Sequence, residues 1–171
     1  CERCARLCRD VQGIGALTVN YRVGTVEGHG GSLLNSTCVS CGLCVANCPV
    51  GALVAKNEMS PAREVKTTCS YCGVGCGIYL GIRGSLVVGI RGDPDNPVNR
   101  GNLCVKGRFG YSYVNHPDRL TSPLIKRDGK FIEATWEEAL DLVAAKLANY
   151  KGEQFAGLAS AKCTNEENYL I

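Results

Sequence analysis

The spacing of the cysteines constrains this chain more than any other feature. Twelve of its 171 residues are cysteines, and eleven of them fall in three groups in which mostly two or three residues separate neighbouring cysteines. Cysteines that close usually cannot pair with each other, so their sulfurs converge on one point instead. A disulfide framework is the alternative, but it is typical of small secreted proteins in oxidising compartments. The grouping therefore predicts metal centres.

The middle group has the spacing Cys-x2-Cys-x2-Cys-x3-Cys-Pro, which is that of bacterial ferredoxins. Its members are Cys38, Cys41, Cys44 and Cys48. Cysteines every three residues wrap the backbone around a cube of four irons and four sulfides, so that amide groups can point at the sulfides. Gly42 allows a turn that a Cβ would hinder, and Pro49 turns the chain away after the last cysteine. The run predicts a [4Fe–4S] site.

The fourth cysteine of such a run binds a second cluster, so a second run should exist. The spacing Cys1-x2-Cys4-x3-Cys8 reproduces the last three cysteines of the pattern, and its first cysteine would lie before Cys1. Crossed pairing then predicts two centres. The incomplete first centre takes Cys1, Cys4 and Cys48, and the second takes Cys8, Cys38, Cys41 and Cys44.

Zinc is the main alternative at these positions. A zinc knuckle pairs two Cys-x2-Cys hooks around one tetrahedral ion. Two longer cysteine runs exceed what one zinc needs, and two zinc ions would not explain Cys48-Pro49. The pattern favours iron–sulfur clusters over zinc.

A third centre is predicted by a different spacing. Its cysteines are Cys69, Cys72, Cys76 and the distant Cys104. The first three lie in a glycine-rich loop, and residues 78–82 and 86–90 flank Arg83-Gly84-Ser85 as a β-hairpin. The loop 92–97, rich in Asp, Asn and Pro, should then turn back towards the centre and bring Cys104 to it.

The remaining sequence predicts the opening of an α/β layer. Residues 131–133 follow a turn as a short strand, and Thr135-x-x-Glu138 is a capping box that starts an amphipathic helix. Residues 155–159 read as a buried strand, and Thr164-x-x-Glu167 opens a second helix. Cys163 stands alone and is interpreted as a packing residue.

Composition excludes several classes of protein. Hydrophobic residues make up 45% of the chain and charged residues 20%, which indicates a globular protein. The net charge is only +3, without a basic run, so no nucleic-acid partner is expected. The longest apolar stretches are strand-length, so no membrane span is expected. The chain begins on a cysteine and is treated as a segment of a longer, cytoplasmic protein.

Residues 1–55, with Val11-Gln12-Gly13 after Cys8, resemble the double-cluster ferredoxin-like domain of the large iron–sulfur subunit of respiratory complex I. The same domain occurs in NAD-linked formate dehydrogenases. The block around Cys69–Cys104 resembles the cluster domain of the molybdopterin oxidoreductases, and the similarity continues through GNLCVKGRFGYSYVNHPDRL into the tail. Within that family the chain is most similar to formate dehydrogenase alpha subunits.

The resemblance implies an α+β fold in three parts. Residues 1–60 would form a ferredoxin-like domain with two [4Fe–4S] clusters, residues 65–120 a small β-rich domain with the third, and residues 121–171 the start of an α/β molybdopterin-binding domain. It also implies a molybdenum or tungsten bis(molybdopterin guanine dinucleotide) centre, whose active-site Cys or selenocysteine would lie beyond Ile171. Formate or CO2 would be the substrate, and a flavin/NAD subunit, a ferredoxin or a hydrogenase the redox partner.

Lys106 is the residue that separates the catalytic branch from its rivals. In the resembled enzymes a lysine two positions after the last cluster cysteine lies between cluster and pterin and relays electrons. If the chain is extended after Cys104, the Lys106 side chain points to the same side as the cysteine. The rivals are a complex I-type subunit without pterin and a free polyferredoxin. The former typically lacks this lysine, and the latter has no use for a capped α/β tail.

Overall fold

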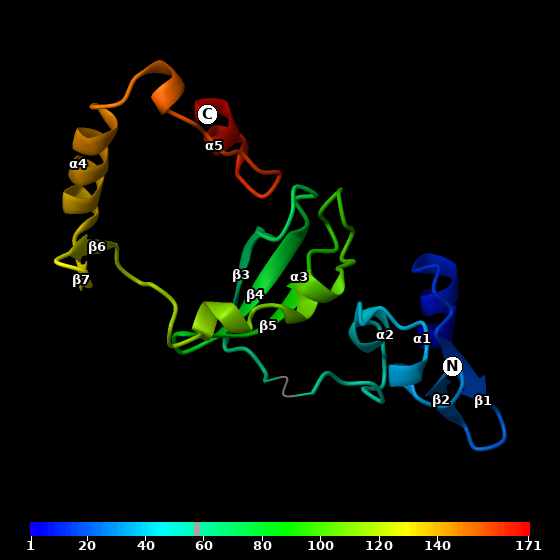
Figure 1. Ribbon diagram of the computed structural model, residues 1–171. Coiled ribbons are helices and arrows are strands. Elements are labelled where there is room, and N and C mark those ends of the chain that lie inside the picture. Colours follow the sequence, from blue (N-terminus) through cyan, green and yellow to red (C-terminus); the bar gives the residue numbers. More distant parts are fainter. Residues whose placement is uncertain (57–58) are drawn as a thin grey trace. The chain divides into compact units, whose positions relative to one another are not determined.

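The computed structural model describes residues 1–56 and 59–171, which form two compact units, Cys1–Asn115 and His116–Ile171 (Figure 1). The described residues contain both helices and strands, as the α+β prediction requires. Three separate small antiparallel sheets are present among them, ordered β1-β2, β3-β4-β5 and β6-β7. Each unit is therefore built from local pairings, and each is described by itself below.

The first part of the N-terminal unit consists of short helices, one pair of strands and the loops between them. Helix α1 (Arg3–Arg6) continues into a single π-turn, η1 (Leu7–Val11), of the kind often found at functional sites. Strands β1 (Leu17–Asn20) and β2 (Thr25–Gly28) pair antiparallel, followed by the 3-10 turn η2 (Leu33–Asn35) and helix α2 (Leu43–Ala46). The small core here consists of Ala16, Leu17 and Leu43.

The second part is the antiparallel sheet of β3 (Arg63–Thr68), β4 (Gly77–Arg83) and β5 (Leu86–Gly92). The predicted hairpin is confirmed, with a two-residue turn in which Gly84 has φ +60°. Its apolar side chains Ile78, Val87 and Val88 form the core together with Leu103. Helix α3 (Val105–Phe109) packs on β5, and the 3-10 turn η3 (Ser112–Asn115) follows it.

Strand β3 was not predicted, because its sequence lacks the apolar alternation of a half-buried strand. All six of its residues are exposed, and its backbone pairs with β4 along the whole length. Charges add cross-sheet contacts: Glu64 on β3 accepts hydrogen bonds from Arg91 on β5, whose guanidinium also lies 4.0 Å from the centre of the Tyr79 ring. Exposed ion pairs stabilise little, so the backbone ladder is the main attachment.

The C-terminal unit confirms most of the predicted elements. Strands β6 (Leu124–Arg127) and β7 (Lys130–Glu133) pair antiparallel around the predicted turn. Both capping boxes are present, at the starts of α4 (Trp136–Leu147) and α5 (Asn165–Leu170). The short 3-10 turn η4 (Gly152–Gln154) lies between these helices.

The predicted buried strand over residues 155–159 is wrong. These residues form no strand, and the Leu158 side chain is 93% exposed. A strand must satisfy its backbone groups on a neighbouring strand, and no described residue pairs with this segment. The apolar run alone therefore did not determine its structure.

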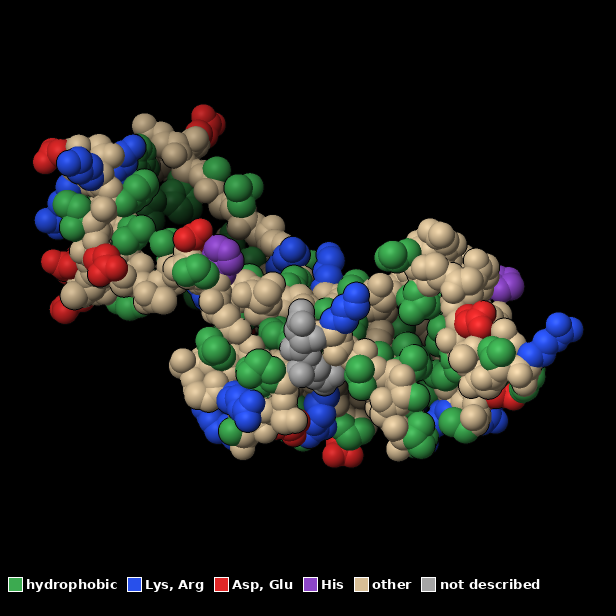
Figure 2. All heavy atoms as spheres, turned by 90° about the horizontal axis from the view of Figure 1, so that it is seen from below, with side chains coloured by type: hydrophobic (Ala, Val, Ile, Leu, Met, Phe, Trp, Pro, Cys, Tyr) green, Lys and Arg blue, Asp and Glu red, His purple; other side chains and the backbone are tan. Residues whose placement is uncertain are grey.

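Hydrophobic side chains are spread over the molecular surface, as the face in Figure 2 shows. Large apolar residues of α4 illustrate this, since Trp136 is 70% exposed and Leu140 is 60% exposed. The predicted amphipathic helix exists, but its apolar face is uncovered among the described residues. None of the helices in the described part of the chain is long and apolar enough to cross a membrane.

The capping box of α4 gives a first prediction. Thr135 accepts the Glu138 N–H at 3.2 Å, and the Glu138 carboxylate accepts the Thr135 N–H at 2.9 Å. Thr135→Ala should destabilise the helix start by about 1 kcal/mol. Amide hydrogen exchange in the first turns of α4 should then accelerate about fivefold. Thr121→Ala, the same change at an exposed residue outside any helix, is the control. Equal exchange in both variants would show that the cap does not hold the helix.

Candidate metal centres

One cavity of the N-terminal unit gathers the cysteines predicted for the complete ferredoxin-type centre. Its lining includes Cys8, Cys38, Cys41 and Cys44. Cys8 comes from the π-turn after α1, Cys38 and Cys41 come from the loop leading into α2, and Cys44 lies in α2 itself. Cys48 does not line this cavity, although it belongs to the same sequence run. The arrangement is the one that crossed pairing requires, and ligation by these four residues stays a prediction.

Backbone amide groups point at the sulfurs in this cavity. The Ala16 N–H donates to Cys8 Sγ at 3.3 Å, and the Ser40 N–H donates to Cys38 Sγ at 3.4 Å. The latter needs a tightly wound loop, in which Ser40 and Gly42 have φ of +53° and +71°. N–H groups aimed at sulfur favour the thiolate that binds iron.

The negative charge of several thiolates in one cavity favours the binding of a cation there. Burial raises the pKa of the Cys44 thiol, and the neighbouring Cys41 and Cys38 thiolates raise it further. Three thiolates this close repel one another when nothing positive lies between them. A bound metal ion has the opposite effect, because its positive charge lowers the pKa of coordinating thiols and keeps them deprotonated. The residues therefore fit a cationic iron–sulfur core.

Cys48 lies in different surroundings from the cavity cysteines. Its Sγ accepts the Ala52 N–H at 3.2 Å, and hydrogen bonds from the backbone of Leu53 and Val50 lower the pKa of its thiol. Its predicted co-ligand Cys4 belongs to α1, which packs against α2. Cys1, the other co-ligand, is exposed. The structure thus lowers the pKa of Cys48 and places the helix of Cys4 beside the segment that leads to it.

The third group of cysteines also converges. The Cys69 N–H donates to the Cys76 carbonyl at 2.8 Å, which closes the glycine-rich loop. Burial raises the pKa of the Cys76 thiol, and the negative charges of Cys69, Cys72 and Cys104 raise it further. The distant Cys104 therefore lies close enough to Cys76 for its charge to act on that thiol. Residues 92–102 must fold back for this to happen, as predicted.

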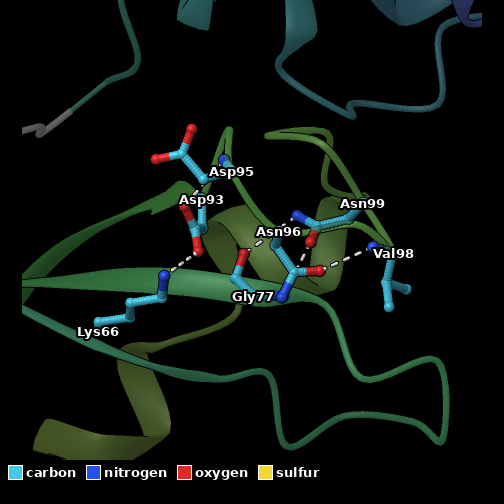
Figure 3. A network of polar contacts seen from close by, with 7 residues as sticks. All are labelled: Lys66, Gly77, Asp93, Asp95, Asn96, Val98 and Asn99. Carbon is cyan, nitrogen blue, oxygen red and sulfur yellow. Dashed lines mark hydrogen bonds and ion pairs between the residues drawn. The ribbon is translucent and has the colours of Figure 1, made fainter.

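The amide side chain of Asn99 is one of the groups that hold residues 92–102 in their folded-back position (Figure 3). Asn99 accepts the Gly77 N–H at 2.8 Å and donates to the Gly77 carbonyl at 3.0 Å and to the Asn102 carbonyl at 2.9 Å. Gly77 directly follows Cys76, and Asn102 lies two residues before Cys104. Asn99 therefore ties the two ends of this cysteine set together.

A buried carboxylate anchors the same loop. Asp93 is 0% exposed, and its Oδ2 lies 2.7 Å from Lys66 Nζ (Figure 3). Its backbone carbonyl accepts the Gly101 N–H at 2.8 Å. Hydrogen bonding to Lys66 lowers the pKa of Asp93, and the same contact raises the pKa of Lys66. The pair keeps Asp93 ionised in the interior, so the loop is held to β3 as well as to β4.

A single metal ion does not find a ready site here. Among residues 1–56 and 59–171, no three His, Cys, Asp or Glu side chains are grouped so that they could hold one ion. A cube of four irons needs sulfurs that stand further apart than the ligands of one ion do. The fit to such a cube rests on the shared cavity, the inward amide groups and the thiolate chemistry.

The backbone at Lys106 differs from the extended conformation expected from the sequence. Residues 105–109 form α3, so the chain is not extended after Cys104, and the alternation of side chains along a strand does not apply. Lys106 is exposed near the start of this helix. Lys106 is thus close to Cys104 in the sequence, but an extended backbone does not bring their side chains to the same side. Its relay role stays a prediction.

Arg108 is a residue of interest that sequence reasoning missed. Its side chain is only 7% exposed, and its Nε donates to the Cys41 carbonyl at 2.8 Å. Its backbone N–H donates to the Cys104 carbonyl at 3.1 Å. The signal available in sequence was its spacing of four from Cys104, which is one helical turn. Nothing in the sequence indicates that this arginine is buried.

Three family models match consecutive stretches of the chain. The 4Fe-4S dicluster domain matches residues 1–52, the molybdopterin oxidoreductase Fe4S4 domain matches residues 62–116, and molybdopterin oxidoreductase matches residues 119–171. These matches define the chain as the iron–sulfur electron-transfer part of a molybdopterin oxidoreductase. It belongs to the molybdopterin oxidoreductase family, which confirms the resemblance.

Among the relatives are formate dehydrogenases and a subunit of a different enzyme. F420-dependent formate dehydrogenase 2 subunit alpha of Methanococcus maripaludis is 48% identical over 66% of this chain and 17% of its own length. The putative formate dehydrogenase YrhE of Bacillus subtilis is 42% identical over 71% of this chain and 13% of its own length. An NADH-quinone oxidoreductase subunit of Rhizobium meliloti is 40% identical over 99% of this chain and 20% of its own length. The chain thus spans about a fifth of the length of such relatives.

The Asn99 contacts give a second prediction. Asn99→Ala leaves the buried Gly77 N–H without its acceptor, which costs about 1–3 kcal/mol, and it frees the loop that carries Cys104. The variant should lose about four irons per chain, those of one cube, as measured by iron and acid-labile sulfide analysis. Asn102→Ala is the control, because its exposed side chain is removed while the carbonyl that Asn99 contacts remains. Full iron content in Asn99→Ala would contradict this role.

Proposed function

We propose that this chain is the iron–sulfur part of a formate dehydrogenase alpha subunit. The parent reaction oxidises formate to CO2, a proton and two electrons, or runs in reverse. The observation that carries the electron-transfer role is the cavity that brings Cys8 to the Cys38–Cys44 loop. The formate role is supported by formate dehydrogenase relatives at 42–48% identity over part of the chain, three of which are alpha subunits.

The chain's own residues supply three cysteine sets for three [4Fe–4S] clusters. The sets are Cys1, Cys4 and Cys48 with a ligand from before Cys1; Cys8, Cys38, Cys41 and Cys44; and Cys69, Cys72, Cys76 and Cys104. A molybdenum or tungsten bis(molybdopterin guanine dinucleotide) centre beyond this chain would supply the two-electron chemistry. The cysteine sets would hand electrons singly to a redox partner, which we take to be a flavin/NAD subunit, a ferredoxin or a hydrogenase.

A complex I-type subunit is the second candidate, and one observation favours it. The NADH-quinone oxidoreductase relative is 40% identical over 99% of this chain, whereas a putative formate dehydrogenase that aligns with the whole chain is 29% identical. Molybdenum or tungsten analysis of the intact protein separates the two candidates. About one metal atom per chain supports formate dehydrogenase, and its absence supports the complex I-type subunit. The match of residues 119–171 to molybdopterin oxidoreductase argues against a free polyferredoxin.

Crossed ligation gives a third prediction. The intact protein should contain about twelve irons and twelve sulfides, three cubes of four. Cys8→Ser should damage the cluster of the Cys38–Cys44 loop, although Cys8 lies far away in sequence. Cys48→Ser should spare that cluster and damage the one held by Cys1 and Cys4. EPR spectra of the reduced variants, each compared with Cys163→Ser, report which signal is lost.

Two results would contradict this assignment. Loss of the Cys38–Cys44 signal in Cys48→Ser would show that the run binds its cluster without crossing. Stoichiometric zinc with little iron would remove the electron-transfer role altogether.

Lys106 gives a fourth prediction. An ammonium group near an anionic cluster and an anionic pterin balances charge that a neutral side chain leaves uncompensated. Lys106→Met should keep the iron, the sulfide and the pterin but lose most formate-dependent turnover. Lys106→Arg should recover only part, because a forked guanidinium is not a compact ammonium. Lys130→Met, at another exposed lysine, is the control. Near-normal turnover in Lys106→Met would make this residue an ordinary surface lysine.

A further inference from the structure

Arg108 makes hydrogen bonds to cysteines of two different predicted centres. Its side-chain Nε donates to the carbonyl of Cys41, which belongs to the ferredoxin-type set, at 2.8 Å. Its backbone N–H donates to the carbonyl of Cys104, which belongs to the third set, at 3.1 Å. One residue therefore links two ligand loops that come from different parts of the sequence.

The contact is built into the fold and is not a chance meeting of surfaces. Gly42 follows Cys41, and a Cβ on it would collide with Arg108 Cδ and lie 2.8 Å from Phe109 Cζ. Gly42 also has φ +71°, a conformation that glycine adopts without strain. The cysteine loop therefore sits directly against the side chains of α3. A larger residue at position 42 would push the two apart.

The charge of Arg108 is also unusual for its place. The side chain is 7% exposed, and a guanidinium stays charged in proteins. Burying a charge is costly unless opposite charge compensates it. The Cys41 carbonyl, which accepts a hydrogen bond from Nε, supplies part of that compensation. The observed packing thus places a permanent cation on the helix that follows Cys104 and against the loop that carries Cys41.

We propose that Arg108 is the positioning residue for electron transfer between the third centre and the ferredoxin-type centre. The inference rests on the proposed electron-transfer function and names the route within it. The route consists of the Cys104 carbonyl, the Arg108 backbone and side chain, and the Cys41 carbonyl, joined by two hydrogen bonds. In one transfer the third centre is oxidised by one electron and the ferredoxin-type centre is reduced by one. Arg108 releases no proton, because a guanidinium is not deprotonated in proteins.

The inference is tested on the intact protein with Arg108→Met and Arg108→Lys. Arg83→Met, the same change at an exposed arginine of the β4–β5 hairpin, is the matched control. Iron and sulfide analysis first establishes that the clusters are assembled. An EPR-monitored titration with dithionite then gives the midpoint potential of each centre. Photoreduction by a deazaflavin, followed in time, gives the rate of electron exchange between the two centres.

Arg108→Met should keep its iron and shift the reduction equilibrium of the ferredoxin-type centre about tenfold towards the oxidised form, which is about 59 mV for one electron. Exchange between the two centres should be slower than in Arg83→Met. Arg108→Lys should restore the potential, because it keeps the positive charge, but not the rate, because it lacks the fork that holds the Cys41 carbonyl. This split between potential and rate distinguishes a route from a merely structural contact.

Unchanged potential and exchange rate in Arg108→Met, with full iron, would overturn the inference while leaving the proposed function intact. If Arg108→Met loses iron, Arg108→Lys decides, and a wild-type exchange rate in that variant would overturn the inference. Absence of iron–sulfur clusters from the wild-type protein would instead overturn the proposed function itself. The two failures are therefore separable by the iron analysis.

Discussion

The mutual repulsion of converging thiolates is the constraint on which the rest of this structure depends. It adds to burial in raising the pKa values of Cys44 and Cys76, so each site is unfavourable until something positive or hydrogen-bonding faces the sulfurs. The chain supplies amide groups through tightly wound loops, and it places the guanidinium of Arg108 next to the Cys41 carbonyl. Iron would supply the remaining positive charge. The glycines, the π-turn and the folded-back loop all serve this convergence.

Local sequence signals predicted the local elements, and long-range polar contacts escaped them. The hairpin at Gly84 and the capping boxes at Thr135 and Thr164 depend on neighbours within a few residues, and the structure confirms them. Strand β3 has no apolar alternation and is defined by a partner, so it was missed. The apolar run 155–159 has no such partner, and its predicted strand is wrong. Cysteine spacing pointed to the four cysteines that line one cavity, and their ligation stays a prediction. Asn99 and Arg108 act through long-range contacts that the cysteine spacing does not reveal.

The relatives have an iron–sulfur part in common although they belong to different kinds of enzyme. A subunit of an NADH-quinone oxidoreductase and alpha subunits of formate dehydrogenases both align with this chain. Cysteine sets that carry electrons can serve either enzyme, because a one-electron carrier does not depend on the reaction that supplies the electrons. The choice between the two depends on whether the intact protein binds molybdenum or tungsten and a pterin. Lys106, exposed near the start of α3, is the one position in this chain on which we base that choice.

Iron anomalous diffraction from crystals of the intact protein tests the central claim most directly. The account predicts one iron cluster bounded by Cys8, Cys38, Cys41 and Cys44 and another bounded by Cys69, Cys72, Cys76 and Cys104, with Arg108 between them. A third should lie against Cys1, Cys4 and Cys48. An iron peak that takes Cys48 together with Cys38, Cys41 and Cys44, or cysteine sets without iron, would contradict it.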